Sequence, residues 1–350
     1  MDVARYRRQI TLTGPEAQER LLDSHVAVIG AGGLGSPALL YLAGAGVGRI
    51  SLIDDDVVDL SNLHRQVIHS TETVGEKKVD SAARAMAALN PDVEVVRIAQ
   101  RLTWANAMEL LADTDVILDG ADNFDTRHIA SHAAARLGIP HVWGSILGYE
   151  SQMSVFWAGH GPIYEDLFPA PPAPGVVPSC AQAGVLGPVV GVTGSAMAME
   201  ALKVLIGVGE VLVGKLGYFD SLAGTWECVP VVGDPAVTQR VLENDPPLQV
   251  QPDVPAVDEI PAGATVIDVR EPDEFEQFHI PGAVNVPLSR ILAGENVAGP
   301  AVVHCAVGGR SAQAIEALAA RGVTGLVNLR GGIERWQQTH KNVDLPPSNS

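Results

Sequence analysis

The chain has 350 residues, of which 47% are hydrophobic and 18% are charged, and its formal net charge is −18 at pH 7. This length supports two or three hydrophobic cores, and the composition excludes an intrinsically disordered protein. The acidic balance argues against nucleic-acid binding, because neutralising phosphates requires a basic surface and the arginines form no extended run.

The first predicted strand, 25–29, ends in a glycine-rich turn, and the segment reads HVAVIGAGGLG. A second strand, 50–53, ends at Asp54, which follows Gly35 by nineteen residues. Glycines let backbone N–H groups and a helix N-terminus approach phosphate oxygens, and an acid at this distance suits a ribose hydroxyl. The segment predicts a nucleotide site with Gly30, Gly32, Gly33 and Gly35 in its turn. Taken alone, the motif also fits an NAD-binding dehydrogenase or a tight turn in a sheet that binds no nucleotide.

Polar and basic residues of the types that a triphosphate requires follow Asp54. They are Asn62, Arg65, Gln66 and Lys78. ATP carries more negative charge than NAD, and attack on its α-phosphate needs donors for the oxygens that gain charge in the transition state. For Lys78 alone, the competing interpretation is a position on the solvated face of the predicted helix 79–89.

The segment VILDGADN places Asp122 and Asn123 just after an apolar run, 116–118. Ligands of open parallel sheets bind beyond the carboxyl ends of the strands, so a carboxylate at this point suits a Mg²⁺ ion on the phosphates. The competing interpretation is that Asp122 caps a helix that begins near Asn123. We expect ATP and Mg²⁺ as cofactors, with Asp122 as the metal ligand.

Strand-like and helix-like segments alternate through the first two thirds of the chain. The strand-like runs are 25–29, 50–53, 93–98, 116–118 and the segment around Val142. This alternation predicts an α/β fold with a Rossmann-like, doubly wound, mainly parallel sheet. The apolar segment 185–199 contains glycines and a proline and soon reaches Glu200 and Lys203, so it predicts a buried helix and no membrane span.

Prolines mark two irregular segments. The first, 161–179, contains six prolines and predicts a long loop with little secondary structure. The second, 243–261, predicts an extended linker between a first domain, 1–242, and a second domain, 262–346.

Five motifs of the first domain, RYRRQ, GAGGLGSP, LIDDD, SNLHRQ and LDGADN, occur in this order. Together they resemble the ubiquitin-activating-enzyme-like adenylyltransferases of bacteria, in particular those that act on the sulfur carriers of molybdopterin and thiamine synthesis. The resemblance implies that ATP adenylates the C-terminal glycine of a small ubiquitin-fold carrier protein that ends in Gly-Gly.

The same resemblance implies roles for individual residues. Asp54 would hold the ribose, Asp122 the Mg²⁺ ion, and Asn62, Arg65, Gln66 and Lys78 the phosphates. Arg8, in RYRRQ, would reach the phosphates of the neighbouring subunit, so the resemblance also implies a homodimer.

The family pattern is broken at its zinc site. Members that bind zinc carry two CxxC pairs, but Ile163 and Asp166 stand where the cysteines of the first pair would fall, and the second segment reads DPAVTQR. Four sulfur ligands are therefore not available, and we expect no zinc.

The second domain contains the blocks TVIDVREPDEFEQFHIPGAVNVP, VVHCAVGGRS and LRGGIERW. Cys305 ends a buried strand, and a short glycine-containing loop leads through Arg310 into a helix from Ser311. The helix N-terminus and the charge of Arg310 favour a thiolate, so we expect a lowered pKa for Cys305. Four residues separate Cys305 from Arg310, one fewer than in a phosphatase loop. The blocks resemble a rhodanese sulfurtransferase domain, a small α/β unit in which Cys305 would carry a persulfide.

The chain contains three cysteines, an odd and small number that argues against a disulfide scaffold. Cys180 aligns with a family cysteine near the adenylate and could bond to the activated carrier or resolve a persulfide. Cys228, in the strand-like WECVPV, is expected to be packed in the core. Because no secretory signal begins the sequence, we expect a cytoplasmic protein.

Joined, the two domains predict an adenylyltransferase with sulfurtransferase activity. The residues assigned to catalysis are Cys305, Arg310, Cys180, Arg65 and Asp122. A persulfide on Cys305, loaded from thiosulfate or a persulfide donor, would convert the adenylated carrier into a thiocarboxylate. Molybdopterin or thiamine synthesis is the expected pathway, with cysteine synthesis and tRNA thiolation as alternatives. An NAD-linked oxidoreductase would bind NAD without ATP turnover, and a non-catalytic dimeric scaffold would be expected to lose Arg65 and Lys78.

Overall fold

A computed structural model describes residues 3–171, 184–243, 254–306 and 308–339. The described residues divide into two compact units, one up to residue 243 and the other from residue 254. Each unit has its own sheet and its own hydrophobic cores.

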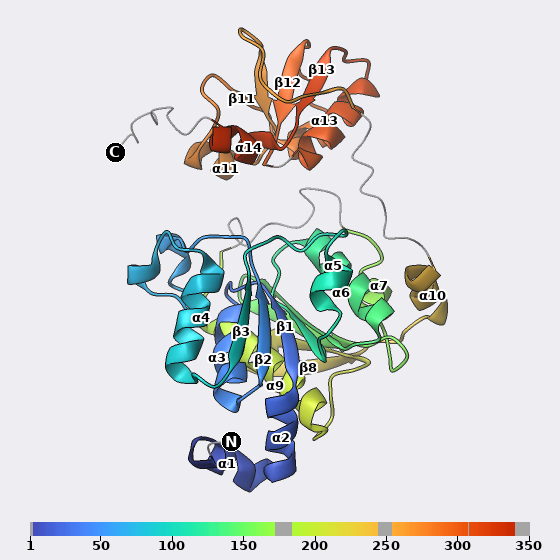
Figure 1. Ribbon diagram of the computed structural model, residues 1–350. Coiled ribbons are helices and arrows are strands. Elements are labelled where there is room, and N and C mark those ends of the chain that lie inside the picture. The colour runs from blue at the N-terminus through green and yellow to red at the C-terminus, as the bar shows by residue number, and fades with distance from the viewer. Residues whose placement is uncertain (1–2, 172–183, 244–253, 307, 340–350) are drawn as a thin grey trace. The chain divides into compact units, whose positions relative to one another are not determined.

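The first unit is built on an eight-stranded sheet with the order β3-β2-β1-β4-β5-β6-β7-β8 (Figure 1). Its strands are β1 (His25–Ile29), β2 (Arg49–Ile53), β3 (Glu94–Ile98), β4 (Val116–Asp119), β5 (His141–Leu147), β6 (Glu150–Phe156), β7 (Lys215–Asp220) and β8 (Thr225–Pro230). The first five strands run parallel, and β6, β7 and β8 are antiparallel to their neighbours. The predicted doubly wound, mainly parallel sheet is confirmed. Its strand order reverses between β1 and β4, which is where such sheets bind ligands.

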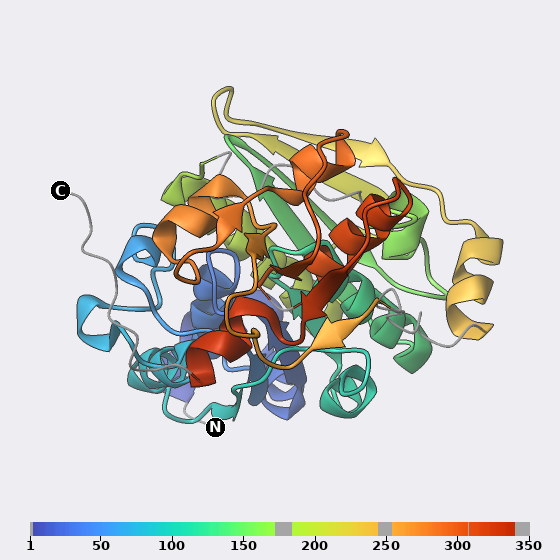
Figure 2. The same cartoon turned by 90° about the horizontal axis from the view of Figure 1, so that it is seen from above.

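Helices cover both faces of this sheet (Figures 1 and 2). They are α1 (Val3–Thr13), α2 (Pro15–Asp23), α3 (Gly35–Ala45), α4 (Lys78–Leu89), α5 (Ala107–Leu111), α6 (Phe124–Leu137), α7 (Tyr164–Leu167), α9 (Gly187–Ile206) and α10 (Pro235–Glu243), with short 3-10 turns η1 (Leu60–Asn62) and η2 (Thr71–Thr73). Val26 and Val28 of β1 pack toward α3, α4 and α9, whereas Ala27 and Ile29 pack toward α5 and α6. Successive side chains of a strand point to opposite faces, which explains why β1 is a continuous apolar run.

The apolar segment predicted as a buried helix forms α9. Among the described residues, α9 is the one helix that is long and apolar enough to cross a membrane, and half of its apolar window is buried inside the protein. Met197, Ala198 and Ala201 join the core, but Val192 and Met199 are 42% and 53% exposed. The helix therefore belongs to the core along one face and is open along another.

The proline-rich segment 161–179 has little secondary structure in its described part, as predicted. It contains only the short helix α7, whose Tyr164 and Glu165 are buried against α6. One local prediction in this unit was wrong. Cys228 lies in β8 as expected of a strand, but its side chain is exposed, as are all six residues of β8, which is the last strand of the sheet.

The second unit has a five-stranded parallel sheet with the order β11-β10-β12-β13-β9. Its elements are β9 (Ala256–Val257), β10 (Val266–Asp268), α11 (Pro272–Gln277), β11 (Val284–Asn285), α12 (Leu288–Leu292), β12 (Ala301–His304), α13 (Gly309–Ala319), β13 (Leu326–Leu329) and α14 (Gly332–Thr339). The expected linker, 243–261, is too long at its C-terminal end, because β9 pairs with β13 and so belongs to this sheet.

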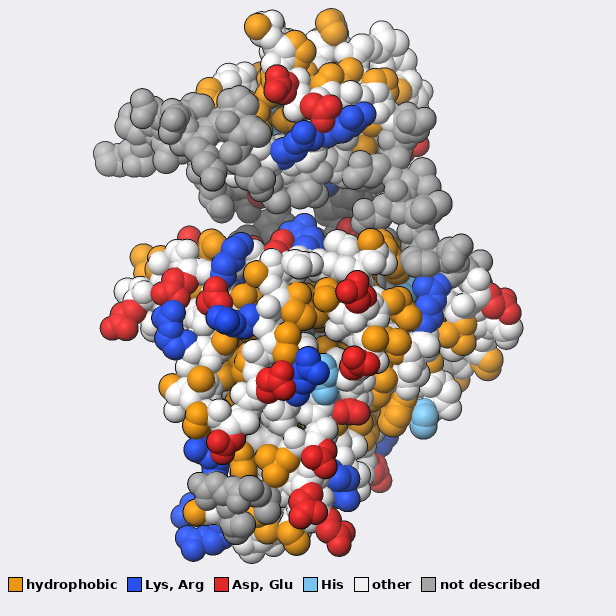
Figure 3. Space-filling model, in the orientation of Figure 1, with side chains coloured by type: hydrophobic (Ala, Val, Ile, Leu, Met, Phe, Trp, Pro, Cys, Tyr) orange, Lys and Arg blue, Asp and Glu red, His pale blue; other side chains and the backbone are white. Residues whose placement is uncertain are grey.

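Charged side chains of both signs are interspersed on the face shown in Figure 3. Among the described residues, several form surface ion pairs, such as Arg84 with Glu76 and Arg97 with Asp80.

Candidate active sites

The glycine turn after β1 is shaped by close approaches of the backbone. Gly30 has a φ of 90°, and a Cβ on it would lie 3.2 Å from the carbonyl oxygen of Gly120. A Cβ on Gly35 would lie 1.9 Å from the carbonyl oxygen of Gly30, so no other residue fits there. A Cβ on Gly33 would lie 3.3 Å from the Val190 side chain, whereas one on Gly32 would lie 3.7 Å from the Gln66 side-chain amide. The turn therefore leads into the N-terminus of α3 with its N–H groups uncovered by side chains.

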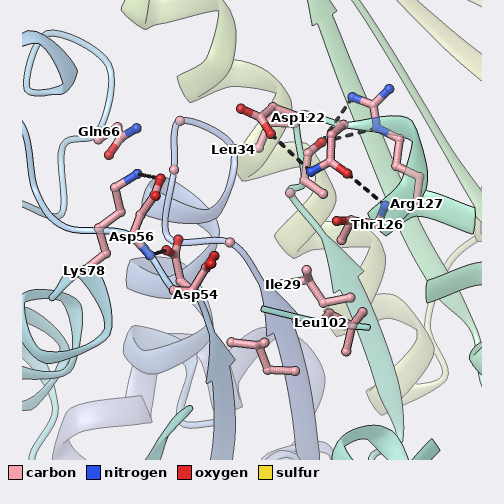
Figure 4. A pocket seen from close by; sticks show the side chains of 18 of the residues that line it. Ile29, Leu34, Asp54, Asp56, Gln66, Lys78, Leu102, Asp122, Thr126 and Arg127 are labelled. Carbon is pink, nitrogen blue, oxygen red and sulfur yellow. Dashed lines mark hydrogen bonds and ion pairs between the residues drawn. The ribbon is translucent and has the colours of Figure 1, made fainter. Parts of the chain in front are cut away.

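A pocket lies beyond the carboxyl ends of β1, β2 and β4, where the strand order reverses (Figure 4). The predicted site residues that line it are Gly30, Gly32, Gly33, Asp54, Arg65, Gln66, Lys78, Asp122 and Asn123. In Figure 4, Asp54, Asp56, Gln66 and Lys78 lie on one side of the pocket, and Asp122, Thr126 and Arg127 on the other. Nine predicted residues that lie far apart in the sequence thus share one site.

Three predicted residues do not line this pocket. Gly35 lies behind the turn, and Asn62 lies in η1, where its carbonyl oxygen accepts hydrogen bonds from the N–H groups of Arg65 and Gln66. Arg8 is exposed on α1, which contacts the C-terminal ends of α3 and α4 through the side chains of Gln9 and Arg5.

Asp54 and Lys78 both have hydrogen-bond partners within the pocket. The Asp54 carboxylate accepts hydrogen bonds from the N–H groups of Ala31 and Asp56, both at 2.8 Å, and burial raises its pKa above the usual value. The Lys78 Nζ lies 3.0 Å from the Asp56 carboxylate. Lys78 is only 5% exposed, so the interpretation that it lies on a solvated helix face is wrong.

The hydrogen bonds at the start of α6 distinguish between the two interpretations of Asp122, as a Mg²⁺ ligand or as the cap of the helix. Asn123 is the N-cap residue, and its Oδ1 accepts a hydrogen bond of 2.9 Å from the N–H of Thr126. Asp122 therefore does not cap the helix. Its exposed carboxylate lies 3.5 Å from the Asn123 amide nitrogen and faces the pocket (Figure 4). A carboxylate oxygen that faces the pocket is a suitable Mg²⁺ ligand.

The sequence interpretation missed several residues of the pocket wall. They are Gln100, Arg101 and Leu102 after β3, and Thr126 and Arg127 in the first turn of α6. The first three follow the carboxyl end of a predicted parallel strand, which was a usable signal. Arg127 gave none, because an arginine in a helix is usually solvated.

The two segments that would carry zinc ligands, one around Ile163 and the other around Asp234, are joined by hydrogen bonds. The Asp166 carboxylate accepts one hydrogen bond from the N–H of Ile163 and another from the N–H of Asp234, both at 2.8 Å. Ile163 is 2% exposed and packs with Ala135 and Val241. These side chains supply no thiolate and do not fit a zinc centre. The absence of zinc stays a prediction.

In the second unit, Cys305 follows β12 and lies at the start of a turn into α13. Its Sγ accepts a hydrogen bond of 3.1 Å from the N–H of Gly308, and the Ser311 hydroxyl lies 3.4 Å away. Gly308 has a φ of 104°, which aims its N–H back at the sulfur. Arg310 forms a bidentate ion pair with Glu274 at 2.6 and 2.7 Å, so the charge expected to act on Cys305 is shared with a carboxylate.

Buried charged and polar side chains contact one another next to this turn. Asp268 is bound by Arg270 at 2.6 Å, and the His304 Nε2 lies 3.6 Å from the same carboxylate. Burial lowers the pKa of His304 below its ordinary value of 6.5. Cys180 lies outside the described residues.

Comparison with protein families decides the identity of the larger unit, because the model of the ThiF family matches residues 6–239. The chain belongs to the ThiF family. A model of the rhodanese-like domain matches residues 256–339. Both resemblances drawn from the sequence motifs are thus confirmed.

One relative of this ThiF-family protein matches it along almost the whole length of both chains. The probable adenylyltransferase/sulfurtransferase MoeZ of Mycobacterium tuberculosis is 42% identical over 96% of this chain and 93% of its own. The sulfur carrier protein adenylyltransferase of Thermus thermophilus is 48% identical over 69% of this chain and 94% of its own.

Solved structures share the fold of the larger unit. The crystal structure titled PaaA matches with a TM-score of 0.58 and 26% identity, covering 67% of this chain and 74% of its own. The Escherichia coli protein MccB, crystallised with ATP, matches with a TM-score of 0.58 and 22% identity over 66% of this chain and 72% of its own.

Proposed function

We propose that this protein is a cytoplasmic adenylyltransferase and sulfurtransferase that activates a small sulfur-carrier protein. One observation carries the proposal. A single chain joins a ThiF-family pocket that retains Arg65, Lys78 and Asp122 to a rhodanese-like turn that retains Cys305. MoeZ, a relative that matches almost the whole chain, is named for both activities.

In the first reaction, the carboxylate of the carrier's C-terminal glycine attacks the α-phosphate of ATP, and pyrophosphate leaves. Asp54 holds the ribose, while Arg65, Lys78 and the N–H groups of the glycine turn stabilise the charge that develops on the phosphate oxygens. A Mg²⁺ ion held by Asp122 would neutralise further phosphate charge. The product is an acyl-adenylate, in which a poor electrophile has gained a good leaving group.

In the second reaction, the Cys305 thiolate takes the outer sulfur of thiosulfate, sulfite leaves, and Cys305 becomes a persulfide. The terminal sulfur then attacks the acyl carbon of the adenylate, and AMP leaves. A second thiol, for which Cys180 is the candidate, cleaves the resulting S–S bond and releases the carrier thiocarboxylate. The two protein sulfurs remain as a disulfide, which a cellular thiol must reduce.

A homodimer is part of the proposal, because Arg8 is too far from the pocket of its own chain. α1 contacts the C-terminal end of α3, whereas the pocket lies at its N-terminal end. Eleven helical residues separate these ends by about 16 Å. Arg8 could therefore act only on the pocket of a second copy.

Mixing two inactive variants tests this arrangement. In a mixed dimer of Arg8→Ala and Lys78→Ala chains, one pocket receives an intact Arg8 and keeps its own Lys78. Recovery of pyrophosphate release on mixing supports the shared pocket, and no recovery from stably mixed dimers contradicts it.

The coupled reaction is tested by the intact mass of the carrier. Purified protein is incubated with ATP, Mg²⁺, thiosulfate, a thiol reductant and a panel of Gly-Gly-ending ubiquitin-fold carriers. A gain equal to the exchange of one oxygen for sulfur identifies the carrier and thereby the pathway, for which molybdopterin or thiamine synthesis is expected. Pyrophosphate release without this gain would separate adenylation from the rhodanese-like unit, and NAD binding without ATP turnover would refute the proposal.

A further inference from the structure

The backbone N–H and carbonyl oxygen of Ala121, directly before Asp122, are both held by buried charged groups. The N–H of Ala121 donates a hydrogen bond of 2.9 Å to the Asp119 carboxylate. Its carbonyl oxygen accepts two hydrogen bonds from the Arg127 guanidinium, from Nε at 3.3 Å and from Nη2 at 3.1 Å. Asp119 is fully buried and Arg127 is 6% exposed.

Burying these two charged side chains costs folding free energy, although they hold only one residue of the backbone. A buried charge destabilises a fold unless it is paired or well hydrogen-bonded. The other oxygen of Asp119 accepts a hydrogen bond of 3.0 Å from the His141 Nε2. Arg127 forms no ion pair with any carboxylate that the structure describes, and its guanidinium contacts the Ser145 hydroxyl and the ring of Phe124. The negative Asp119 and the positive Arg127 therefore lie on opposite sides of Ala121, and each is stabilised by hydrogen bonds to the backbone of this residue.

Starting helix α6 does not require this arrangement, because Asn123 already caps the helix. The segment that Asp119 and Arg127 hold instead adjoins the glycine turn. The N–H of Gly120 donates to the carbonyl oxygen of Ile29 at 2.9 Å, and a Cβ on Gly30 would lie 3.2 Å from the Gly120 carbonyl oxygen. The contacts of Asp119 and Arg127 with Ala121, here called the clamp, thus fix a backbone segment that touches the glycine turn on one side and carries Asp122 on the other.

We propose that Asp119 and Arg127 are positioning residues for Asp122. By binding both the N–H and the carbonyl oxygen of Ala121, they hold the backbone from which the Asp122 carboxylate would reach a metal ion on the phosphates, so this carboxylate is oriented before the nucleotide binds. Such preorganisation removes a reorganisation cost from metal and phosphate binding. The inference rests on the proposed function, because it assigns Asp122 to Mg²⁺–ATP.

The test is a double-mutant cycle on nucleotide binding. Arg127→Lys keeps the positive charge but cannot make the same paired hydrogen bonds to Ala121, and Asp122→Asn removes the carboxylate that the clamp is proposed to orient. The affinity of each variant for a non-hydrolysable ATP analogue is measured by calorimetry with and without Mg²⁺. Arg136→Lys, on the same helix but outside the pocket lining, is the matched control.

We expect Arg127→Lys to reduce the Mg²⁺-dependent gain in affinity about tenfold, as is typical for residues that orient metal ligands, with unchanged metal-free affinity. In the Asp122→Asn background, the same change should cause no further loss. Pyrophosphate exchange should follow the same pattern, while thiosulfate sulfurtransferase activity of the same samples stays at the wild-type level.

Additive losses in the cycle would overturn the inference, as would a loss of metal-free affinity, which would mean that Arg127 contacts the nucleotide directly. If Arg127→Lys does not fold, Asp119→Asn is taken through the same cycle with the same expectations. A wild-type protein without Mg²⁺-dependent ATP binding would contradict the proposed function itself. Wild-type-like binding by the Arg127→Lys variant would contradict this inference alone.

Discussion

Removing the Asp166 carboxylate should destabilise the first unit by about 2 kcal/mol. Asp166 accepts hydrogen bonds from two backbone N–H groups, one in its own turn and one at Asp234, 68 residues later. In Asp166→Ala both donors lose their partner. An ordinary hydrogen bond contributes about 0.5–1.5 kcal/mol net, and because the Ile163 bond is half-buried and the Asp234 bond is exposed, we take about 1 kcal/mol for each and add no penalty for an unsatisfied buried donor.

In a domain of this size, 2 kcal/mol corresponds to a shift of about 4–8 °C in the midpoint of thermal unfolding. Differential scanning calorimetry of the full chain measures it, and the transition of the first unit is identified as the one that ATP raises. Asp166→Asn keeps one carbonyl oxygen and should lose at least half as much. Asp92→Ala, at an exposed position of the same unit, is the control.

Two results would refute this reasoning. A midpoint for Asp166→Ala equal to that of the Asp92→Ala control would show that the two hydrogen bonds contribute nothing. A lower midpoint of the wild type after dialysis against a metal chelator would show that a metal, and not the carboxylate, joins the two segments.

Three further predictions concern the two reactions and the second unit. Lys78→Ala should abolish pyrophosphate release and spare thiosulfate sulfurtransferase activity, and Cys305→Ala should do the reverse; loss of both activities in either variant would contradict two separate sites. Ser311→Ala should slow alkylation of Cys305 by iodoacetamide at neutral pH about tenfold, since a hydrogen bond to a charged group contributes about 1.5–3 kcal/mol; an unchanged rate would show that the hydroxyl does not stabilise the thiolate. Because the pKa of His304 is lowered in the folded state, the unfolded chain binds the extra proton below pH 6.5, and stability should fall with decreasing pH by up to about 1.4 kcal/mol per pH unit. Thermal melts between pH 5 and 8 check this, and the His304→Gln variant should show a flatter profile.

Much of the fold could be predicted because its signals are local. Alternating apolar runs and helical stretches marked β1 to β4, and the glycine turn needed only one short segment. The pocket was also within reach, because Asp54 follows β2 directly and Asp122 follows the end of β4 by three residues, and parallel strands place such residues at one edge of the sheet.

The features that the sequence could not predict depend on partners far along the chain. Arg127 is buried beside the pocket because its guanidinium contacts Ser145 and Trp143 of β5, and Glu274 lies 36 residues before the Arg310 that it binds. Helix α7 forms where its side chains find a buried site against α6. Cys228 is exposed because β8 lies at the end of the sheet, and strand order does not follow from the strand sequence itself.

The two proposed reaction centres have the same order of backbone elements. In one, β1 ends before a turn at Gly30 and α3 follows; in the other, β12 ends just before Cys305 and α13 follows through Gly308. In the proposed reactions, the N–H groups of the first turn bind the phosphates of a nucleotide that diffuses in, and those of the second turn bind a sulfur that is covalently attached to the protein. The residue that follows the strand therefore distinguishes the two centres, because glycine leaves room for a ligand from solution and cysteine supplies a reacting atom that stays with the chain.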